Sequence, residues 1–298
     1  MTKPVHIIFI HGLSNKPPKG DLRRIWLEAL AKDSNGNKGF DLASEGVSDS
    51  FVYWADLFND SPMSASDYES RNDELEQETA EVDLNINEWV SKMQIYYPDV
   101  EEDYDEPKFD DLSVDNEESH YEAIPIPWFL KKRIMRQLVK EAHDYLFNVN
   151  DVRNVILSRV IDEINKLPVE TECVLVGHSL GSVITYDILT SKVECKSIKG
   201  MMTIGSPLGL DEIQYKLEWT RDNGFPKKLK GDWFNVYDSF DVVSRPDPKL
   251  SNDFKKNGAE VVIDINEQNS GYWRHSATKY FEGPKLRRCL RLLCNREV

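Results

Sequence analysis

The stretch Cys173 to Tyr186 reads CVLVGHSLGSVITY, and the rest of the chain is arranged around it. Its first four residues are apolar and partly β-branched, which is typical of a buried strand that is too short for a helix. Gly177 to Gly181 then forms a G-x-S-x-G arrangement, and helical spacing follows it. A strand that turns at once into a helix forces Ser179 into a strained conformation and lifts its hydroxyl above the sheet edge.

Two further features of this turn favour a nucleophilic serine. Side chains at Gly177 and Gly181 would collide with the neighbouring strand and helix, so glycine is needed at both positions. The turn also places the backbone N–H of Leu180 at a helix N-terminus, where developing negative charge is stabilised. The alternative is a glycine-rich turn with an incidental serine, because a bare G-x-S-x-G also occurs by chance. The strand and helix on either side favour the nucleophile.

Composition limits the class of protein. The chain has 298 residues, 40% of them hydrophobic, which suits one large α/β domain with an insertion or two small domains. No apolar stretch approaches the roughly 18 residues of a membrane span, and the amino-terminal MTKPVHIIFIHG lacks the shape of a signal peptide. The four cysteines have no metal-ligand spacing, so we expect reduced thiols in a cytoplasmic protein. They are Cys173, Cys195, Cys289 and Cys294.

The net charge of −15 is concentrated in one segment, since residues 56–122 contain 23 acidic residues and 3 basic ones. We interpret residues 59–122 as an acidic insertion, part cap or lid and part solvated loop, in a catalytic domain formed by residues 1–58 and 123–298. Such a stretch repels phosphate, so we expect no nucleic-acid partner. A basic protein that docks on the insertion is a further hypothesis. The insertion lacks the D-x-D-x-D-G pattern of a calcium loop.

Apolar strands alternate with amphipathic helices outside the insertion, which predicts an α/β fold with a doubly wound, mostly parallel sheet. Strands are predicted at 5–10, 51–54, 173–176, 198–204, 233–237 and 261–265. Helices are predicted at 19–32, 127–147, 151–167, 180–190, 211–222 and 277–293, with a short helix at 85–97 inside the insertion. The basic face of the helix at 127–147 is either solvated, or docked on the insertion, or part of a lid that touches anionic lipid.

A serine nucleophile needs an imidazole to take its proton and a carboxylate to orient that imidazole. In enzymes that carry a G-x-S-x-G turn between a strand and a helix, the order along the chain is serine, acid, histidine. His275 is the one histidine C-terminal to Ser179, in a loop between the last strand and the last helix, so we predict that it is the base. His11 is interpreted as a structural residue that braces the loop after the first strand. In that loop the N–H of Leu13 would be the second oxyanion donor.

The acid must come from the loop after the penultimate strand, and the candidates are Asp238, Asp241 and Asp247. Asp238 begins the turn, where a carboxylate commonly stabilises the chain reversal. Asp241 lies where the loop can bring its side chain back over the sheet edge. We therefore favour Asp241 and keep Asp238 as the alternative acid.

In this order the motifs resemble the α/β-hydrolase superfamily and, within it, the lipase-like serine esterases. They are His11-Gly12-Leu13, Gly177-His178-Ser179-Leu180-Gly181, Gly205-Ser206-Pro207-Leu208, Asp241-Val242-Val243 and His275. The resemblance implies a triad of Ser179, Asp241 and His275, with the amides of Leu13 and Leu180 as the oxyanion hole. The motif at 205–208 also recurs in relatives that deacylate lipid-linked inositol, where it lines the site.

The expected reaction is hydrolysis of a carboxylic ester, from a small molecule or a lipid, through an acyl-enzyme. Hydrolysis of a phospholipid or lipid-linked acyl group, an amide or a thioester by the same triad is an alternative. The remaining alternative is a non-catalytic binding protein with the same fold. No cofactor or metal is expected, because the chain has no H-E-x-x-H, no P-loop and no G-x-G-x-x-G.

Overall fold

The computed structural model describes residues 3–34, 36–77, 140–191, 195–217 and 224–297. Six of the strands in these ranges form one sheet, in the order β2-β1-β3-β4-β5-β8, with every adjacent pair parallel. These strands are β1 (Val5–Ile10), β2 (Ser48–Val52), β3 (Glu172–His178), β4 (Gly200–Ile204), β5 (Trp233–Tyr237) and β8 (Val262–Asn266). The predicted α/β class and its mostly parallel sheet are confirmed.

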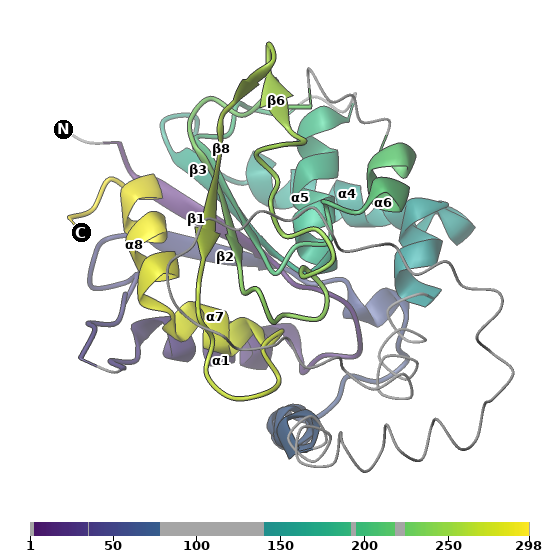
Figure 1. Ribbon diagram of the computed structural model, residues 1–298, viewed down its shortest axis with the longest axis vertical. Coiled ribbons are helices and arrows are strands. Elements are labelled where there is room, and N and C mark those ends of the chain that lie inside the picture. The colour runs from purple at the N-terminus through teal and green to yellow at the C-terminus, as the bar shows by residue number, and fades with distance from the viewer. Residues whose placement is uncertain (1–2, 35, 78–139, 192–194, 218–223, 298) are drawn as a thin grey trace, which may run out of the picture.

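Helices cover both faces of this sheet (Figure 1). On one face lie α1 (Lys19–Ala31), α7 (Ala277–Glu282) and α8 (Pro284–Leu293). On the other lie α4 (Val152–Asn165), α5 (Leu180–Thr190) and α6 (Asp211–Lys216). The chain moves from β1 to β2 in one direction and from β3 to β5 in the other, and right-handed connections then place the helices on opposite faces.

The apolar character of the strands follows from the helices that cover both faces of the sheet. In β1, Ile8 and Ile10 face one core, whereas Val5, Ile7 and Phe9 face the other. All six residues of β1 are buried. A parallel sheet covered on both faces needs strands that are apolar throughout, because successive side chains point to opposite faces.

Several predicted bounds differ from the structure, most clearly those of β2 and of the closing helix. β2 begins at Ser48 instead of residue 51, because the His6 ring in β1 hydrogen-bonds the hydroxyls of Ser48, at 2.8 Å, and Ser50, at 3.0 Å. It ends before Trp54, where the chain turns into the 3₁₀ helix η1 (Ala55–Leu57). The closing helix predicted at 277–293 is two helices, since Gly283 is extended at ψ 130° and the ring of Pro284 disfavours a helical residue before it.

A hairpin and a helical segment were missed, and some predictions fall outside the described residues. β6 (Lys255–Lys256) and β7 (Ala259–Glu260) form a hairpin around Asn257-Gly258, and both turn residues have positive φ. Helical residues also occur at 65–77 and 140–146, and η2 (Val149–Asp151) precedes α4. The predicted helix at 85–97, most of the insertion, residues 127–139 of the basic helix and residues 218–222 of the helix after β4 lie outside the described ranges.

The described ranges contain no helix with the length and apolar character needed to cross a membrane.

Candidate active site

Ser179 forms a strained turn between β3 and α5. Its φ of 56° and ψ of −127° lie in a region that residues other than glycine rarely adopt. A Cβ on Gly177 would lie 2.3 Å from the carbonyl oxygen of Gly181 in α5, and a Cβ on Gly181 would lie 2.2 Å from that of Ile10 in β1. The predicted steric requirement for both glycines is therefore present.

The loop after β1 lies directly beside this serine. A Cβ on Gly12 would be 2.6 Å from the Cβ of Ser179 and 3.2 Å from its Oγ. β1 and β3 are neighbours from which the chain leaves in opposite directions, and ligands of parallel sheets bind at such a reversal, outside the carboxyl ends of the strands. The predicted nucleophile and the predicted oxyanion loop thus occupy the position where this topology forms a site.

Leu13 and Leu180 each carry an amide that the described part of the chain leaves without a hydrogen-bond acceptor. Leu180 is the first residue of α5, where a helix has no internal partner for its N–H groups. Free amides next to Ser179 suit an oxyanion hole, and that assignment stays a prediction.

His275 and Asp241 are joined by a hydrogen bond of 2.8 Å between Nδ1 and Oδ2. The other donors to this fully buried carboxylate are the N–H of Val243, at 2.9 Å, and the hydroxyl of Tyr280, at 2.8 Å. Burial raises the pKa of Asp241, but His275 and these donors outweigh burial, so the pKa is lower than usual. Asp241 is therefore an anion that fixes the imidazole with its proton on Nδ1 and leaves Nε2 as the acceptor.

The pair lies beside the Ser179 turn. A Cβ on Gly205, which follows β4, would lie 2.7 Å from Asp241 Oδ2 and 3.2 Å from His275 Nδ1. The residue before it, Ile204, accepts a hydrogen bond of 2.9 Å from the N–H of Ser179. Among the described residues no hydrogen bond joins the Ser179 hydroxyl to His275. The structure therefore joins the predicted base and acid, and the contact of the base with the nucleophile stays a prediction.

Asp238, the alternative acid, is engaged elsewhere. Its carboxylate accepts hydrogen bonds from the N–H of Phe240, at 2.8 Å, the N–H of Asn269, at 2.7 Å, and Arg274 Nη1, at 3.2 Å. These partners are those of a carboxylate that stabilises a turn. The geometry thus favours Asp241 as the residue that orients His275.

Two other histidines support the site as neutral rings. His11 Nδ1 donates to the Gly12 carbonyl at 2.7 Å, its Nε2 accepts from the N–H of Trp54 at 3.0 Å, and burial lowers its pKa to about 3. His11 thus braces the loop after β1. His178 donates from Nε2 to the His275 carbonyl at 3.1 Å, with its ring centroid 4.8 Å from that of His275, and burial lowers its pKa well below the usual value.

Sequence reasoning missed four side chains that hold these loops. Tyr280 binds Asp241, Glu76 binds the segment before His275, and Lys16 and Glu141 bind the segment after Gly12. None lies in a recognisable motif, and three of them, Glu76, Glu141 and Tyr280, act on loops that are distant in the chain. Only the fold shows their roles.

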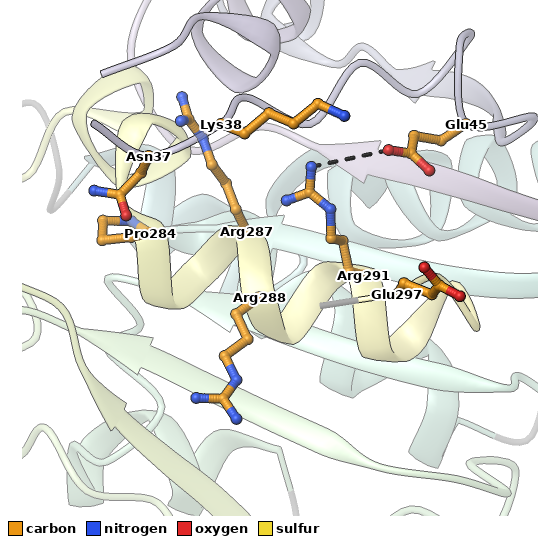
Figure 2. Close-up of a pocket in the computed structure, with 8 residues that line it drawn as sticks. All are labelled: Asn37, Lys38, Glu45, Pro284, Arg287, Arg288, Arg291 and Glu297. Carbon is orange, nitrogen blue, oxygen red and sulfur yellow. Dashed lines mark ion pairs between the residues drawn. The ribbon is translucent and has the colours of Figure 1, made fainter. Parts of the chain in front are cut away.

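A separate hollow of about 520 Å³ lies between α8 and residues 37–45 (Figure 2). Lys38, Arg287 and Arg291 lie on one side of α8, whereas Arg288 points away from them (Figure 2). Glu45 lies 4.0 Å from the Arg291 guanidinium. None of the residues that line this hollow belongs to the predicted triad.

Arg287 has a structural role in this hollow. It is almost fully buried, and its guanidinium donates to the carbonyls of Phe281, at 2.8 Å, Ala29, at 2.8 Å, and Lys32, at 2.6 Å. The carbonyls of Ala29 and Lys32 lie at the C-terminus of α1, where a cation satisfies unpaired acceptors. Arg287 therefore fastens α8 to the end of α1.

Within the described ranges no cluster of three or more histidine, cysteine or carboxylate side chains is arranged to hold a metal ion. All four cysteines are free.

No protein-family model matches this chain, and neither does any curated protein.

Proposed function

We propose that the chain is a serine hydrolase with an α/β-hydrolase fold, which cleaves a carboxylic ester through an acyl-enzyme, with residues 59–122 as an acidic cap. The observation that carries the proposal is the 2.8 Å hydrogen bond between His275 and the buried Asp241, next to a serine in a strained turn. Charged and strained groups of this kind cost stability, so their presence at one sheet edge supports a catalytic use.

In the first half of the proposed reaction, the Ser179 oxygen forms a bond with the ester carbonyl carbon while His275 Nε2 takes the hydroxyl proton. Asp241 stabilises the resulting imidazolium. The Leu13 and Leu180 amides bind the oxyanion. The bond from carbon to the alcohol oxygen then breaks, and His275 returns its proton to the leaving alcohol.

Water completes the cycle. His275 takes a proton from a water molecule whose oxygen attacks the acyl carbon, and the bond to Ser179 then breaks as His275 returns the proton to the serine oxygen. The products are the carboxylic acid and the free enzyme. Amides, thioesters and phospholipid acyl groups would follow the same steps with a different leaving group.

The proposal is tested with a fluorophosphonate probe and intact-mass analysis. We expect one adduct per chain, on the peptide that contains Ser179. A panel of p-nitrophenyl esters of increasing acyl length, with matched thioesters, anilides and phospholipids, then identifies the preferred bond. A folded protein with neither an adduct nor turnover would favour the non-catalytic binding protein.

The proposed compartment and partners follow from composition. Four free cysteines suit the reducing cytoplasm. A basic protein that docks on the acidic insertion would associate in a salt-sensitive manner.

Tyr280→Phe is expected to lower the free energy of unfolding by about 1–3 kcal/mol, because the N–H of Asp238 loses its buried acceptor and Asp241 loses a donor. The measurement is urea unfolding followed by circular dichroism. Tyr272→Phe is the matched control, since the Tyr272 side chain is 46% exposed. Equal stability of the two variants would contradict the role assigned to the Tyr280 hydroxyl.

A further inference from the structure

Two helical segments flank residues 78–139 in the sequence, one at 65–77 and one at 140–146. Each segment carries one glutamate that accepts hydrogen bonds from a loop of the predicted active site. Glu141 reaches the oxyanion loop, and Glu76 reaches the loop that carries His275.

Glu141 and Lys16 hold one peptide group from both ends. The N–H of Ser14 donates to Glu141 Oε2 at 2.8 Å, and Lys16 Nζ donates to the carbonyl of Leu13. Ser14 has a φ of 77°, which is costly for a residue other than glycine and persists only when neighbours impose it. The preceding peptide carries the predicted oxyanion donor, the Leu13 N–H. The position of that donor therefore depends on the held peptide.

The segment at 140–146 is itself fastened to the helix that follows Ser179. Tyr145 is fully buried, and its hydroxyl donates to Asp187 of α5 at 2.6 Å. Arg153 of α4 makes two hydrogen bonds of 2.7 and 2.6 Å with the same carboxylate. Glu141 thus approaches the oxyanion loop from a support that is fixed to the nucleophile helix.

Glu76 holds the loop of the predicted base in a similar way. Its carboxylate accepts hydrogen bonds from the N–H groups of Tyr272, at 2.5 Å, and Trp273, at 2.8 Å, and from Lys279 Nζ, at 2.6 Å. A Cβ on Gly271, where φ is 74°, would lie 2.0 Å from Glu76 Oε1. The loop can accept this carboxylate because glycine occupies that position.

We propose that Glu76 and Glu141 are positioning residues, through which the segments flanking residues 78–139 set the geometry of the His275 loop and of the oxyanion loop. The inference rests on the proposed function for its effect on rate, but not for the contacts themselves. A misplacement of about 1 Å in a catalytic group can cost a factor of about 10² in rate.

Hydrogen exchange tests the contacts without any need for activity. Glu141→Ala should speed exchange in the peptide that contains Ser14, and Glu76→Ala should do so in the peptide that contains Tyr272 and Trp273. The matched controls are Asp144→Ala and Glu74→Ala, each on the same helical segment as the residue it controls. Exchange rates in both loops equal to those of the controls would overturn the proposal.

Kinetics with p-nitrophenyl butyrate then test positioning against a merely structural role. Each alanine variant should lower kcat by about tenfold or more with little change in KM, because the transition state is misaligned while binding is retained. Glu141→Gln and Glu76→Gln keep an acceptor oxygen and should recover part of kcat. If the wild type is active and the alanine variants have the same kcat as the controls, the positioning role is overturned while the proposed function stands. An inactive wild type that lacks a Ser179 adduct would overturn the proposed function instead, and hydrogen exchange would still test the contacts.

A pH profile gives a readout specific to the oxyanion loop. Burial lowers the pKa of Lys16 to about 8, with Glu141 raising it and Arg71 lowering it. The Tyr68 ring also faces the ammonium, at 5.6 Å. Deprotonation should loosen the held peptide, so wild-type kcat should fall as pH rises through about 8. Lys16→Met should have low kcat without this alkaline fall, and an identical fall in that variant would exclude Lys16 as its source.

The expected fall in kcat at alkaline pH can be told apart from unfolding, because the Lys16 group makes the free energy of unfolding rise with pH and not fall. The folded chain releases the Lys16 proton at a lower pH than the unfolded chain does. Between those two values the unfolded state binds more protons, so this group makes stability rise with pH. A fall in kcat with unchanged or higher resistance to urea would therefore report the loop geometry. A parallel loss of stability at that pH would contradict this assignment.

Discussion

Ser179→Ala is expected to abolish labelling by a fluorophosphonate and to lower kcat by about 10⁶-fold, in line with the loss of a serine nucleophile in other triads. The variant removes one oxygen from a turn whose φ is 56°. Alanine and serine both carry a Cβ, so the strain of the turn is unchanged and the fold should persist. Amides at the predicted oxyanion hole would leave a small residual rate above that in water.

The measurement combines intact-mass analysis after probe treatment with steady-state hydrolysis of a p-nitrophenyl ester. Ser191→Ala is the control, a serine at the opposite end of the helix that begins after Ser179. Unchanged circular dichroism and an unchanged melting temperature show that the Ser179 variant is folded. Turnover or labelling that survives in the folded variant would exclude this serine as the nucleophile.

Asp241→Asn should lower kcat by about 10⁴-fold. The carboxylate now accepts the Nδ1 proton of His275 at 2.8 Å. An amide nitrogen in that position would donate instead, which favours the tautomer with the proton on Nε2, where it cannot accept from serine. The buried amide also cannot stabilise an imidazolium.

Asp238→Asn separates the two candidate acids. An asparagine there meets the N–H of Asn269 and the Arg274 guanidinium, so we expect a loss of stability of about 1–3 kcal/mol and a kcat within a few-fold of the wild type. Both variants are compared at one pH, with urea unfolding measured in parallel. A larger kcat loss in the Asp238 variant than in the Asp241 variant would assign the acid to Asp238.

Much of the fold could be predicted because its signals are local. β1 and β5 have the predicted bounds, since a strand buried on both faces is mostly apolar, and each of these strands has a single polar residue, His6 or Asn235. The Ser179 turn was also predictable, because glycines on either side of it are needed where β1 and α5 approach. The Asn257-Gly258 hairpin carried a recognisable signal that was missed.

The errors and omissions have physical causes. β2 contains polar residues that pair with His6, a contact between strands that composition does not reveal. Glu141 acts on Ser14 across 127 positions of sequence, and Glu76 acts on Tyr272 across 196. No periodicity links such pairs, so the carboxylates that support the site look like any others in the sequence.

The contact between Arg287 and α1 bears on the order in which the chain can fold during synthesis. Its guanidinium binds the Ala29 carbonyl, 258 positions earlier in the sequence. During synthesis α1 leaves the ribosome long before α8, so the C-terminal acceptors of α1 stay without this partner until translation is nearly complete. This side of the molecule is therefore closed by the last segment to be made, and a nascent chain arrested before residue 284 should remain open to proteases near Ala29.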